Sequence, residues 1–356
     1  RHTLFPYTTL FRSGSVLALA AFLLFGENRF TPINVLLWFG SLAAFLRAFW
    51  IEDGWLEKIR DGWNRFWEEG IRFSPWHLLA LTVFAIAAFF RFYQLREVPP
   101  EMFSDHAEKL LDVAEVLAGR TAIFFPRNTG REAFQMYLTA AVAKIFGTGL
   151  SFLSLKLGTG LAGLFTLPYI YLLGKEIGNR RIGLIAMFLA GVAYWPNVIS
   201  RVALRFTLYP FFAAPLLYYL IRGLRRRRRN DFLLAGIALG LGLHGYSPSR
   251  IVPLVVLVAF LLYVLHQRTT QERKQALVAL SLVVLISLIV FLPLLRFVLE
   301  NYQIFMYRGL TRVSDLERPL PGSPMKIFFQ NLGRALIMFQ WDNGEAWVHS
   351  IPGRPA

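Results

Sequence analysis

The sequence predicts an all-α integral membrane protein, a polytopic bundle of about nine spanning helices. Hydrophobic residues make up 55% of the 356 residues and charged residues only 17%, whereas soluble domains carry about a quarter of charged residues. The apolar residues also come in long runs, and residues 276–295 contain no charge. Since about twenty apolar residues cross the core of a bilayer, such runs indicate spanning helices.

The runs with the length and polarity of spanning helices can be placed in order along the chain. Two other segments predict helices at the membrane surface. Residues 51–74 alternate Trp with charge and predict an amphipathic helix on the cytoplasmic interface. Residues 132–147 reach only about 24 Å as a helix, too short to span. The predicted spans lie near 15–28, 33–50, 75–95, 151–173, 182–199, 206–222, 231–246, 250–266 and 276–298.

The charge pattern predicts the orientation in the membrane. The net charge is +16, and basic residues gather in the loops 175–181, 222–229 and 266–274. Cytoplasmic loops are enriched in Lys and Arg, so these loops are expected inside a bacterial-type plasma membrane. Nucleic-acid binding is not expected, because the Arg225–Arg229 run lies between two apolar segments. The absence of Cys excludes disulfides and thiolate metal sites. The segments expected outside are 96–150, 199–206, 246–250 and 299 onward.

The ends of the chain carry separate expectations. Thr3–Ser13 reads TLFPYTTLFRS, which resembles the translation of a sequencing adapter. Residues 1–13 are therefore expected to be a non-native tail that packs against nothing. We divide the rest into N-terminal transmembrane helices (14–50), the amphipathic segment (51–74), a transmembrane core (75–298) and an external segment (299–356) with an interfacial helix at 326–339.

The external loop 96–150 carries an acidic stripe. Asp105, Glu108, Asp112 and Glu115 follow each other at i, i+3, i+7 and i+10, which is one face of a helix. His106 lies beside the first of them and is a second titratable group. Two explanations stay open here: a catalytic carboxylate, or a capping box formed by Asp105 and Glu108 with the remaining acids facing water.

Arginines accompany the stripe in the segments expected on the same side of the membrane. Gly130 allows a tight turn before a helix start, where backbone N–H groups can bind phosphate. The planar guanidinium suits two phosphate oxygens at once, although each arginine alone could equally be an interfacial anchor. The residues concerned are Arg131, Arg201, Arg205 and Arg250, with Asn128, Glu132 and Tyr246 beside them.

These motifs resemble the GT-C superfamily of polyprenyl-phosphate-sugar glycosyltransferases. Family 39 is the nearest in pattern, with protein O-mannosyltransferases and the aminoarabinose transferase of lipid A. The resemblance covers roughly residues 75–300. His106 stands where that family has a second acid, Ala133 replaces a common Pro, and the turn 199–206 lacks a carboxylate. The matching stretches are Asp105 early in the loop, Gly130–Ala133, Lys144–Gly147, Tyr171–Arg181 and Ser200 with Arg201 and Arg205.

The resemblance implies transfer of a sugar from a polyprenyl phosphate to an external lipid, glycan or protein acceptor, with inversion. Asp105 would be the general base, with His106 and Glu108 near it, and the departing phosphate needs cations rather than a general acid. No cofactor is expected, and use of a divalent metal stays open. The alternatives are a transporter or lipid flippase, which should carry ionisable sites near mid-membrane, and a non-catalytic assembly subunit. The expected phosphate ligands are Arg131, Arg201, Arg205 and Arg250, supported by Asp112, Asn128, Glu132 and Tyr246.

Overall fold

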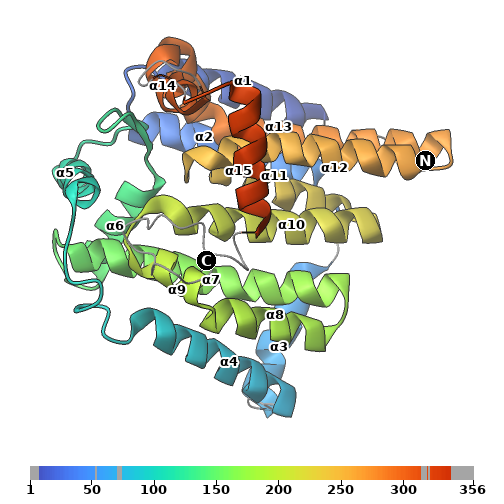
Figure 1. Ribbon diagram of the computed structural model, residues 1–356. Coiled ribbons are helices and arrows are strands. Elements are labelled where there is room, and N and C mark those ends of the chain that lie inside the picture. The colour runs from blue at the N-terminus through green and yellow to red at the C-terminus, as the bar shows by residue number, and fades with distance from the viewer. Residues whose placement is uncertain (1–7, 53, 70–73, 314–318, 320, 338–356) are drawn as a thin grey trace.

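The computed structural model describes the chain except residues 1–7, 53, 70–73, 314–318, 320 and 338–356. It is a helical bundle with one two-stranded sheet. Most long helices lie side by side along one direction (Figure 1). They are α1 (Thr8–Leu24), α2 (Pro32–Phe49), α4 (Pro75–Phe92), α7 (Phe152–Ile177), α8 (Arg180–Val192), α10 (Leu208–Arg226), α11 (Arg229–Leu243), α12 (Val252–His266) and α13 (Thr270–Glu300).

The predicted all-α membrane fold is confirmed, and each predicted span contains a helix. In the described part of the chain, five helical segments are long and apolar enough to cross a membrane singly. They are α2, α4, α7, α12 with the preceding turn, and α13. The helix α1 is apolar but has only 17 residues, and α11 has 15. The count of about nine spans is therefore not confirmed by length and composition alone.

The span predicted at 182–199 is broken rather than continuous. It consists of α8 and α9 (Tyr194–Arg201), which meet at an angle of 56°. Pro196 explains the break, because it has no N–H for the carbonyl of the residue four positions earlier, Val192, where α8 ends, and its ring would clash with that carbonyl. The pair still passes as one bent span, which gives a sixth candidate.

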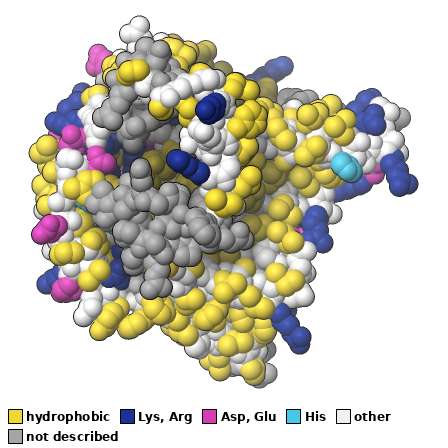
Figure 2. Space-filling model, in the orientation of Figure 1, with side chains coloured by type: hydrophobic (Ala, Val, Ile, Leu, Met, Phe, Trp, Pro, Cys, Tyr) yellow, Lys and Arg dark blue, Asp and Glu magenta, His cyan; other side chains and the backbone are white. Residues whose placement is uncertain are grey.

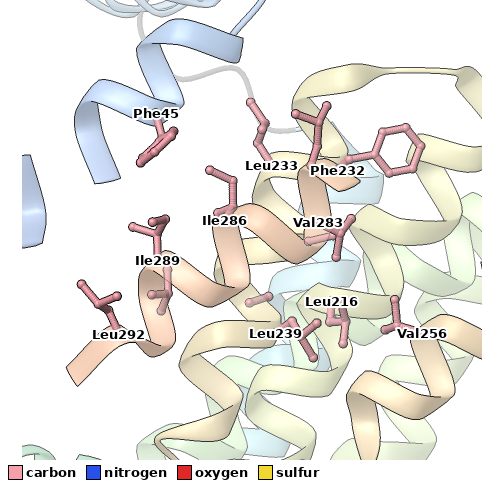
Figure 3. Close-up of a cluster of buried hydrophobic side chains, with 14 of the residues drawn as sticks. Phe45, Leu216, Phe232, Leu233, Leu239, Val256, Val283, Ile286, Ile289 and Leu292 are labelled. Carbon is pink, nitrogen blue, oxygen red and sulfur yellow. The ribbon is translucent and has the colours of Figure 1, made fainter. Parts of the chain in front are cut away.

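The main core lies between α2, α10, α11, α12 and α13 (Figure 3). Leu233, Val283 and Ile286 are fully buried there. Two glycines let α11 approach α13 closely: a Cβ on Gly236 would lie 2.9 Å from Ile286, and one on Gly240 2.5 Å from Val290. Small residues four apart allow this kind of close helix packing in membranes.

The two ends of the bundle carry different segments. At one end the three basic loops join each other through ion pairs, Arg226 with Glu176 at 2.5 Å and Arg227 with Glu272 at 2.6 Å. At the opposite end lie the segments of the long loop (Figure 1). The two groups are separated as the charge pattern predicts. The loop segments are α5 (Ser104–Leu117), β1 (Phe124–Phe125), β2 (Arg131–Glu132) and α6 (Phe134–Ile145), which meet the short 3-10 helices η1 (Arg205–Thr207) and η2 (Ser247–Ile251).

The predicted surface helices are present. The helix α6 has 12 residues, or about 18 Å, and is too short to span. The helix α3 (Trp55–Glu69) runs across the direction of the bundle and exposes Trp63 and Trp67 (Figure 1). Beyond α13, α14 (Tyr302–Val313) follows, and α15 (Pro324–Ile337) occupies the predicted interfacial segment with no buried residue.

One expectation about the N-terminal tail is wrong. Residues 1–7 lie outside the described part of the chain, but Thr8–Ser13 forms the first turns of α1. Phe11 packs edge-on against Phe45 and Phe49, with ring centroids 5.4 and 6.0 Å away. An apolar side chain in register with the buried face of α1 is drawn into the core, whatever the origin of the segment.

Candidate active site

The start of α5 is fixed by a buried imidazole. His106 is fully buried, and its Nδ1 accepts from the N–H of Phe103 at 3.2 Å. Its Nε2 therefore carries the proton and donates to the carbonyl of Val202 at 2.7 Å. Both ring nitrogens are used by the backbone, so the geometry gives His106 a positioning role rather than the catalytic one expected for it. The capping-box explanation is wrong, because the N-cap is Phe103 and Asp105 is the second residue of the helix.

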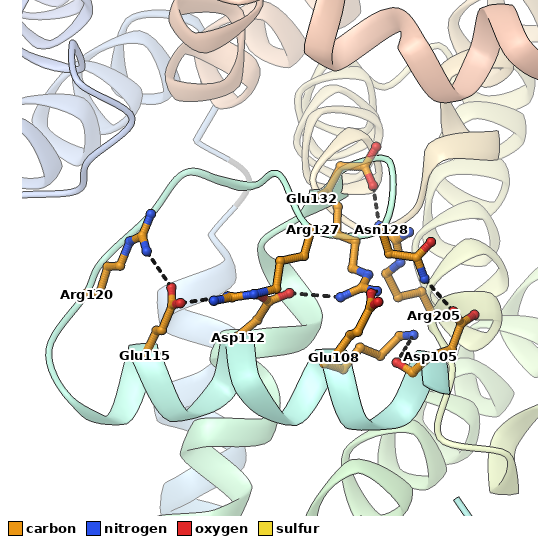
Figure 4. Close-up of polar contacts among 11 residues, drawn as sticks. Asp105, Glu108, Asp112, Glu115, Arg120, Arg127, Asn128, Glu132 and Arg205 are labelled. Carbon is orange, nitrogen blue, oxygen red and sulfur yellow. Dashed lines mark hydrogen bonds and ion pairs between the residues drawn. The ribbon is translucent and has the colours of Figure 1, made fainter. Parts of the chain in front are cut away.

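The acidic stripe does not face water, because the following loop segment folds back over it (Figure 4). Arg131, 1% exposed, pairs with Glu108 at 2.5 Å and with the fully buried Asp112 at 3.0 Å. Arg127 bridges Asp112 at 2.8 Å and Glu115 at 2.6 Å. The stripe is thus a scaffold that holds the loop in place. Arg120 extends it with a further pair to Glu115 at 2.8 Å.

Asp105 differs from the other acids of α5. Its Oδ1 accepts from Nδ2 of Asn128 at 2.5 Å, and no arginine of the described chain pairs with it (Figure 4). The neighbouring ammonium of Lys109 donates to the backbone carbonyl of Asp105 at 2.8 Å. The carboxylate is half-buried, so it is the acid of the stripe that remains available for other chemistry.

The turn between Asn128 and Gly130 joins the two halves of the site. Asn128, Thr129 and Gly130 all have positive φ, at 48°, 63° and 91°. Gly130 is required there, because a Cβ would lie 2.5 Å from the ring of Phe124. The predicted tight turn is confirmed. It leads into β2, where neighbouring side chains point to opposite sides.

Glu132 therefore points away from α5 and toward two other arginines. It is fully buried and accepts from Arg205 at 2.7 Å and from Arg250 at 2.6 Å. Ser247 donates a third hydrogen bond at 3.2 Å. Burial alone would raise the pKa of the Glu132 carboxyl, but the charges of Arg205 and Arg250 hold its pKa below the usual range.

Aromatic rings support the same two arginines. The guanidinium carbon of Arg205 lies 5.5 Å from the ring centroid of Tyr246, and that of Arg250 3.6 Å from Phe305 on α14. Arg250 also donates to the carbonyl of Phe305 at 2.9 Å. Cation–π contacts of this kind fix the plane of a guanidinium. The Arg250 side chain is 22% exposed, against 4% for Arg205, and is the more accessible cation.

Arg201 is held elsewhere. Its guanidinium donates to four carbonyls at the end of α4 and just beyond it, at 2.9 to 3.3 Å. Helix ends leave such carbonyls without intrahelical partners, and a cation complements the helix dipole there. The buried ammonium of Lys156 binds the next stretch, through the carbonyls of Leu95, Arg96 and Pro99 at 2.6, 3.1 and 2.8 Å. These two cations fix the path from α4 to α5, and we assign Arg201 to positioning.

The structure thus brings together most of the residues expected from the sequence. Arg131 and Glu132 are adjacent, and the turn that precedes them reaches Asp105 through Asn128. Among the described residues, no group of three or more acidic or His side chains is arranged to hold a metal ion. The residues of this region that were not expected from the sequence are Arg120 and Arg127 over the stripe, the buried Lys109 and Lys156, and Ser247. Of these residues, only Lys109 could have been predicted from spacing, because it follows Asp105 by four residues on the same helix.

Comparison with known proteins gives a family match for part of the chain. Residues 134–297 match the family model described as dolichyl-phosphate-mannose-protein mannosyltransferase. The match covers slightly less than half of the chain and supports the resemblance to GT-C glycosyltransferases in this segment. It includes Arg205, Tyr246 and Arg250, while Asp105 and Arg131 precede it. No curated protein matches the chain.

Two solved structures of an archaeal oligosaccharyltransferase are similar to the chain. The apo enzyme of Archaeoglobus fulgidus is 15% identical, with a TM-score of 0.49, and the alignment covers 77% of this chain and 40% of that one. The enzyme AglB of the same organism, in complex with an inhibitory peptide and a dolichol-phosphate, is 16% identical with a TM-score of 0.46. That alignment covers 74% of this chain and 39% of that one. The chain therefore spans about two fifths of these structures.

Proposed function

We propose that the protein is a membrane glycosyltransferase that moves a sugar from a polyprenyl-phosphate donor to an acceptor hydroxyl, with Asp105 as general base. The observation that carries the proposal is the contrast within one stripe: Asp105 has no arginine partner in the described chain, whereas Glu108 pairs with one arginine and Asp112 with two. The matched family, whose name refers to a dolichyl-phosphate-mannose donor, supports the donor class.

The chemistry requires one proton transfer and one bond exchange. Oδ2 of Asp105 takes the proton of the acceptor hydroxyl as its oxygen attacks the anomeric carbon. The bond from that carbon to the phosphate oxygen breaks, and its electron pair stays on the phosphate. Attack opposite the leaving group inverts the anomeric centre. Phosphate is a good leaving group when cations hold it, so no general acid is needed.

The donor phosphate is proposed to bind first at Arg250. Arg131 and Arg205 are almost fully buried in pairs with Glu108, Asp112 and Glu132, whereas Arg250 is partly exposed. The guanidinium of Arg250 can donate one N–H group to Glu132 and others to a phosphate. Arg205 would then orient Glu132, and Arg131 would hold the helix α5 that carries Asp105, rather than touch the donor directly.

The transporter alternative has less support. Ionisable groups near mid-membrane are expected in a transporter. In the described helices predicted to span, the buried ionisable residues lie within about two turns of a helix end; they are Arg91, Lys156, Glu176, Asp231 and His244. Polar groups at helix ends favour chemistry at the membrane surface.

The proposal is tested by donor choice. Membranes that contain the full chain are given a sugar labelled in its ring, carried either on polyprenyl phosphate or on a nucleotide. The expected result is label in an acceptor product from the lipid donor only. Two outcomes would reject the proposed transferase. One is direct use of the nucleotide sugar. The other is movement of the lipid-linked sugar across the membrane without any glycosylated product.

The side of the membrane is tested separately. The chain has no Cys, so single cysteines report without background. We expect Arg120→Cys, at a side chain 57% exposed, to react with an impermeant maleimide in intact cells, and Arg228→Cys, 42% exposed, to react only after lysis. The reverse pattern would put the proposed site in the cytoplasm.

A further inference from the structure

A cavity lies at the end of the bundle opposite α5. Its volume is about 850 Å³, and it lies open on one side between the ends of α10, α11, α12 and α13. Small-molecule pockets usually measure about 300 to 1,000 Å³, so this one can hold a ligand. No residue of the candidate active site is among the described residues that line it.

The lining changes from charged to apolar along the helix axis. Arg227, Arg229 and Lys274 lie where the helices end, whereas Leu277 and Leu282 lie further along α13. At 1.5 Å per residue, Leu282 is about 12 Å deeper than Lys274. A phospholipid has the same order of groups, with its phosphate at headgroup depth and its acyl chains below.

The cations at this cavity are only partly neutralised. Arg227 pairs with Glu272 at 2.6 Å. In contrast, Nε of Arg229 is buried without a hydrogen-bond partner, and Lys274 pairs with no acid of the described chain. The neighbouring Arg222 shows what a satisfied guanidinium looks like here, with two hydrogen bonds to Asp231. Arg229 and Lys274 therefore have no acidic partner among the described residues, and Lys274 is exposed.

We propose that this cavity binds one anionic phospholipid of the surrounding leaflet. The phosphate lies between Arg229 and Lys274, and an acyl chain runs along Leu277 and Leu282 toward Phe232. Figure 2 shows basic side chains at this end of the molecule beside a broad hydrophobic surface, as a lipid-facing site requires. A free phosphate would use the cations but leave the apolar wall without a ligand. This site is separate from the proposed sugar transfer.

The test compares matched charge changes on the purified full chain. Native mass spectrometry in detergent measures the retention of added phosphatidylglycerol and of phosphatidylcholine with the same acyl chains. Arg229→Gln with Lys274→Gln should weaken phosphatidylglycerol binding about tenfold, the loss expected for charge-assisted hydrogen bonds. Arg180→Gln with Arg181→Gln removes the same charge from a neighbouring loop outside the cavity, and should leave binding unchanged.

A second variant keeps the charges and narrows the cavity. Leu277→Trp, at a lining position 52% exposed, should also lower phosphatidylglycerol retention, and it answers the question if the double variant fails to fold. Equal losses in both double variants would mean diffuse attraction to basic loops and would overturn the site. Equal retention of phosphatidylcholine, or displacement by inorganic phosphate at the concentration of the lipid, would overturn it as well.

Discussion

Two Arg–Glu ion pairs, one at each end of the bundle, differ in how deeply they are buried. At the α5 end, the Glu132 carboxylate is fully buried between Arg205 and Arg250. At the other end, Arg227 and Glu272 pair at a similar distance while their side chains are 59% and 29% exposed. A buried carboxylate depends on its partners, since water cannot replace them, whereas a solvated pair contributes little. The Glu132 carboxylate should therefore depend on its arginines far more than Glu272 depends on Arg227.

The largest effect on stability should come from removing the buried carboxylate. Glu132→Gln leaves Arg205 and Arg250 facing each other without an acid, and should lower the free energy of unfolding by about 3 to 5 kcal/mol. The matched change Glu272→Gln should have no measurable effect. Thermal unfolding of the detergent-solubilised protein measures both. If the two variants lost equal stability, the contrast between the two ends would be lost.

A smaller effect is expected at the turn that joins Asp105 to Arg131. Gly130→Ala combines a positive φ with a Cβ clash on Phe124, and should cost about 2 to 3 kcal/mol. Gly119 has a similar φ of 95° but no atom within 4 Å of an added Cβ. Gly119→Ala should therefore cost only about 1 kcal/mol. Equal costs would show that the turn is not packed as described.

The smallest expected effect is on the stability of the protein at low pH. The folded-state pKa of Glu132 is lowered, so its contribution to stability is present above the unfolded value of about 4.3 and is lost as the pH falls through the folded pKa. Stability should therefore decline below about pH 4.3. The Glu132→Gln variant should show a weaker decline over the same range, measured by thermal unfolding at several pH values. An identical decline in both proteins would show that protonation of Glu132 does not cause the loss of stability at low pH.

Much of the fold was predictable, because it depends on local patterns. Apolar runs located the helices, and the basic loops predicted which of them share an end of the bundle. Gly130 predicted a turn, because glycine adopts a positive φ such as this one more readily than other residues. The bend before α9 was missed although Pro196 was visible, because spanning helices tolerate an internal proline, as α7 does at Pro168 and α10 at Pro215.

The partners within the site were not predictable in the same way. The stripe on α5 was readable from spacing, but Asp105 is distinguished from Asp112 only by which loop residue lies above each of them. Those contacts join residues 15 to 23 positions apart through an irregular loop. Arg201 looked identical to Arg205 in the sequence, yet one binds helix-end carbonyls and the other a buried acid.

The proposed role of Asp105 is tested most directly by Asp105→Asn in membranes that contain the full chain. Initial rates of sugar transfer are measured over a range of lipid-donor concentrations, together with donor binding. The account predicts that transfer falls at least about a hundredfold while donor binding is retained, because the variant removes the base and no phosphate ligand.

The control for this measurement is Glu115→Gln, which changes another acid of the same stripe. Glu115 pairs with Arg120 and Arg127 at the far end of α5, and its loss should leave the rate near that of the unmodified protein. Transfer by Asp105→Asn at the rate of this control would contradict the assignment of the general base.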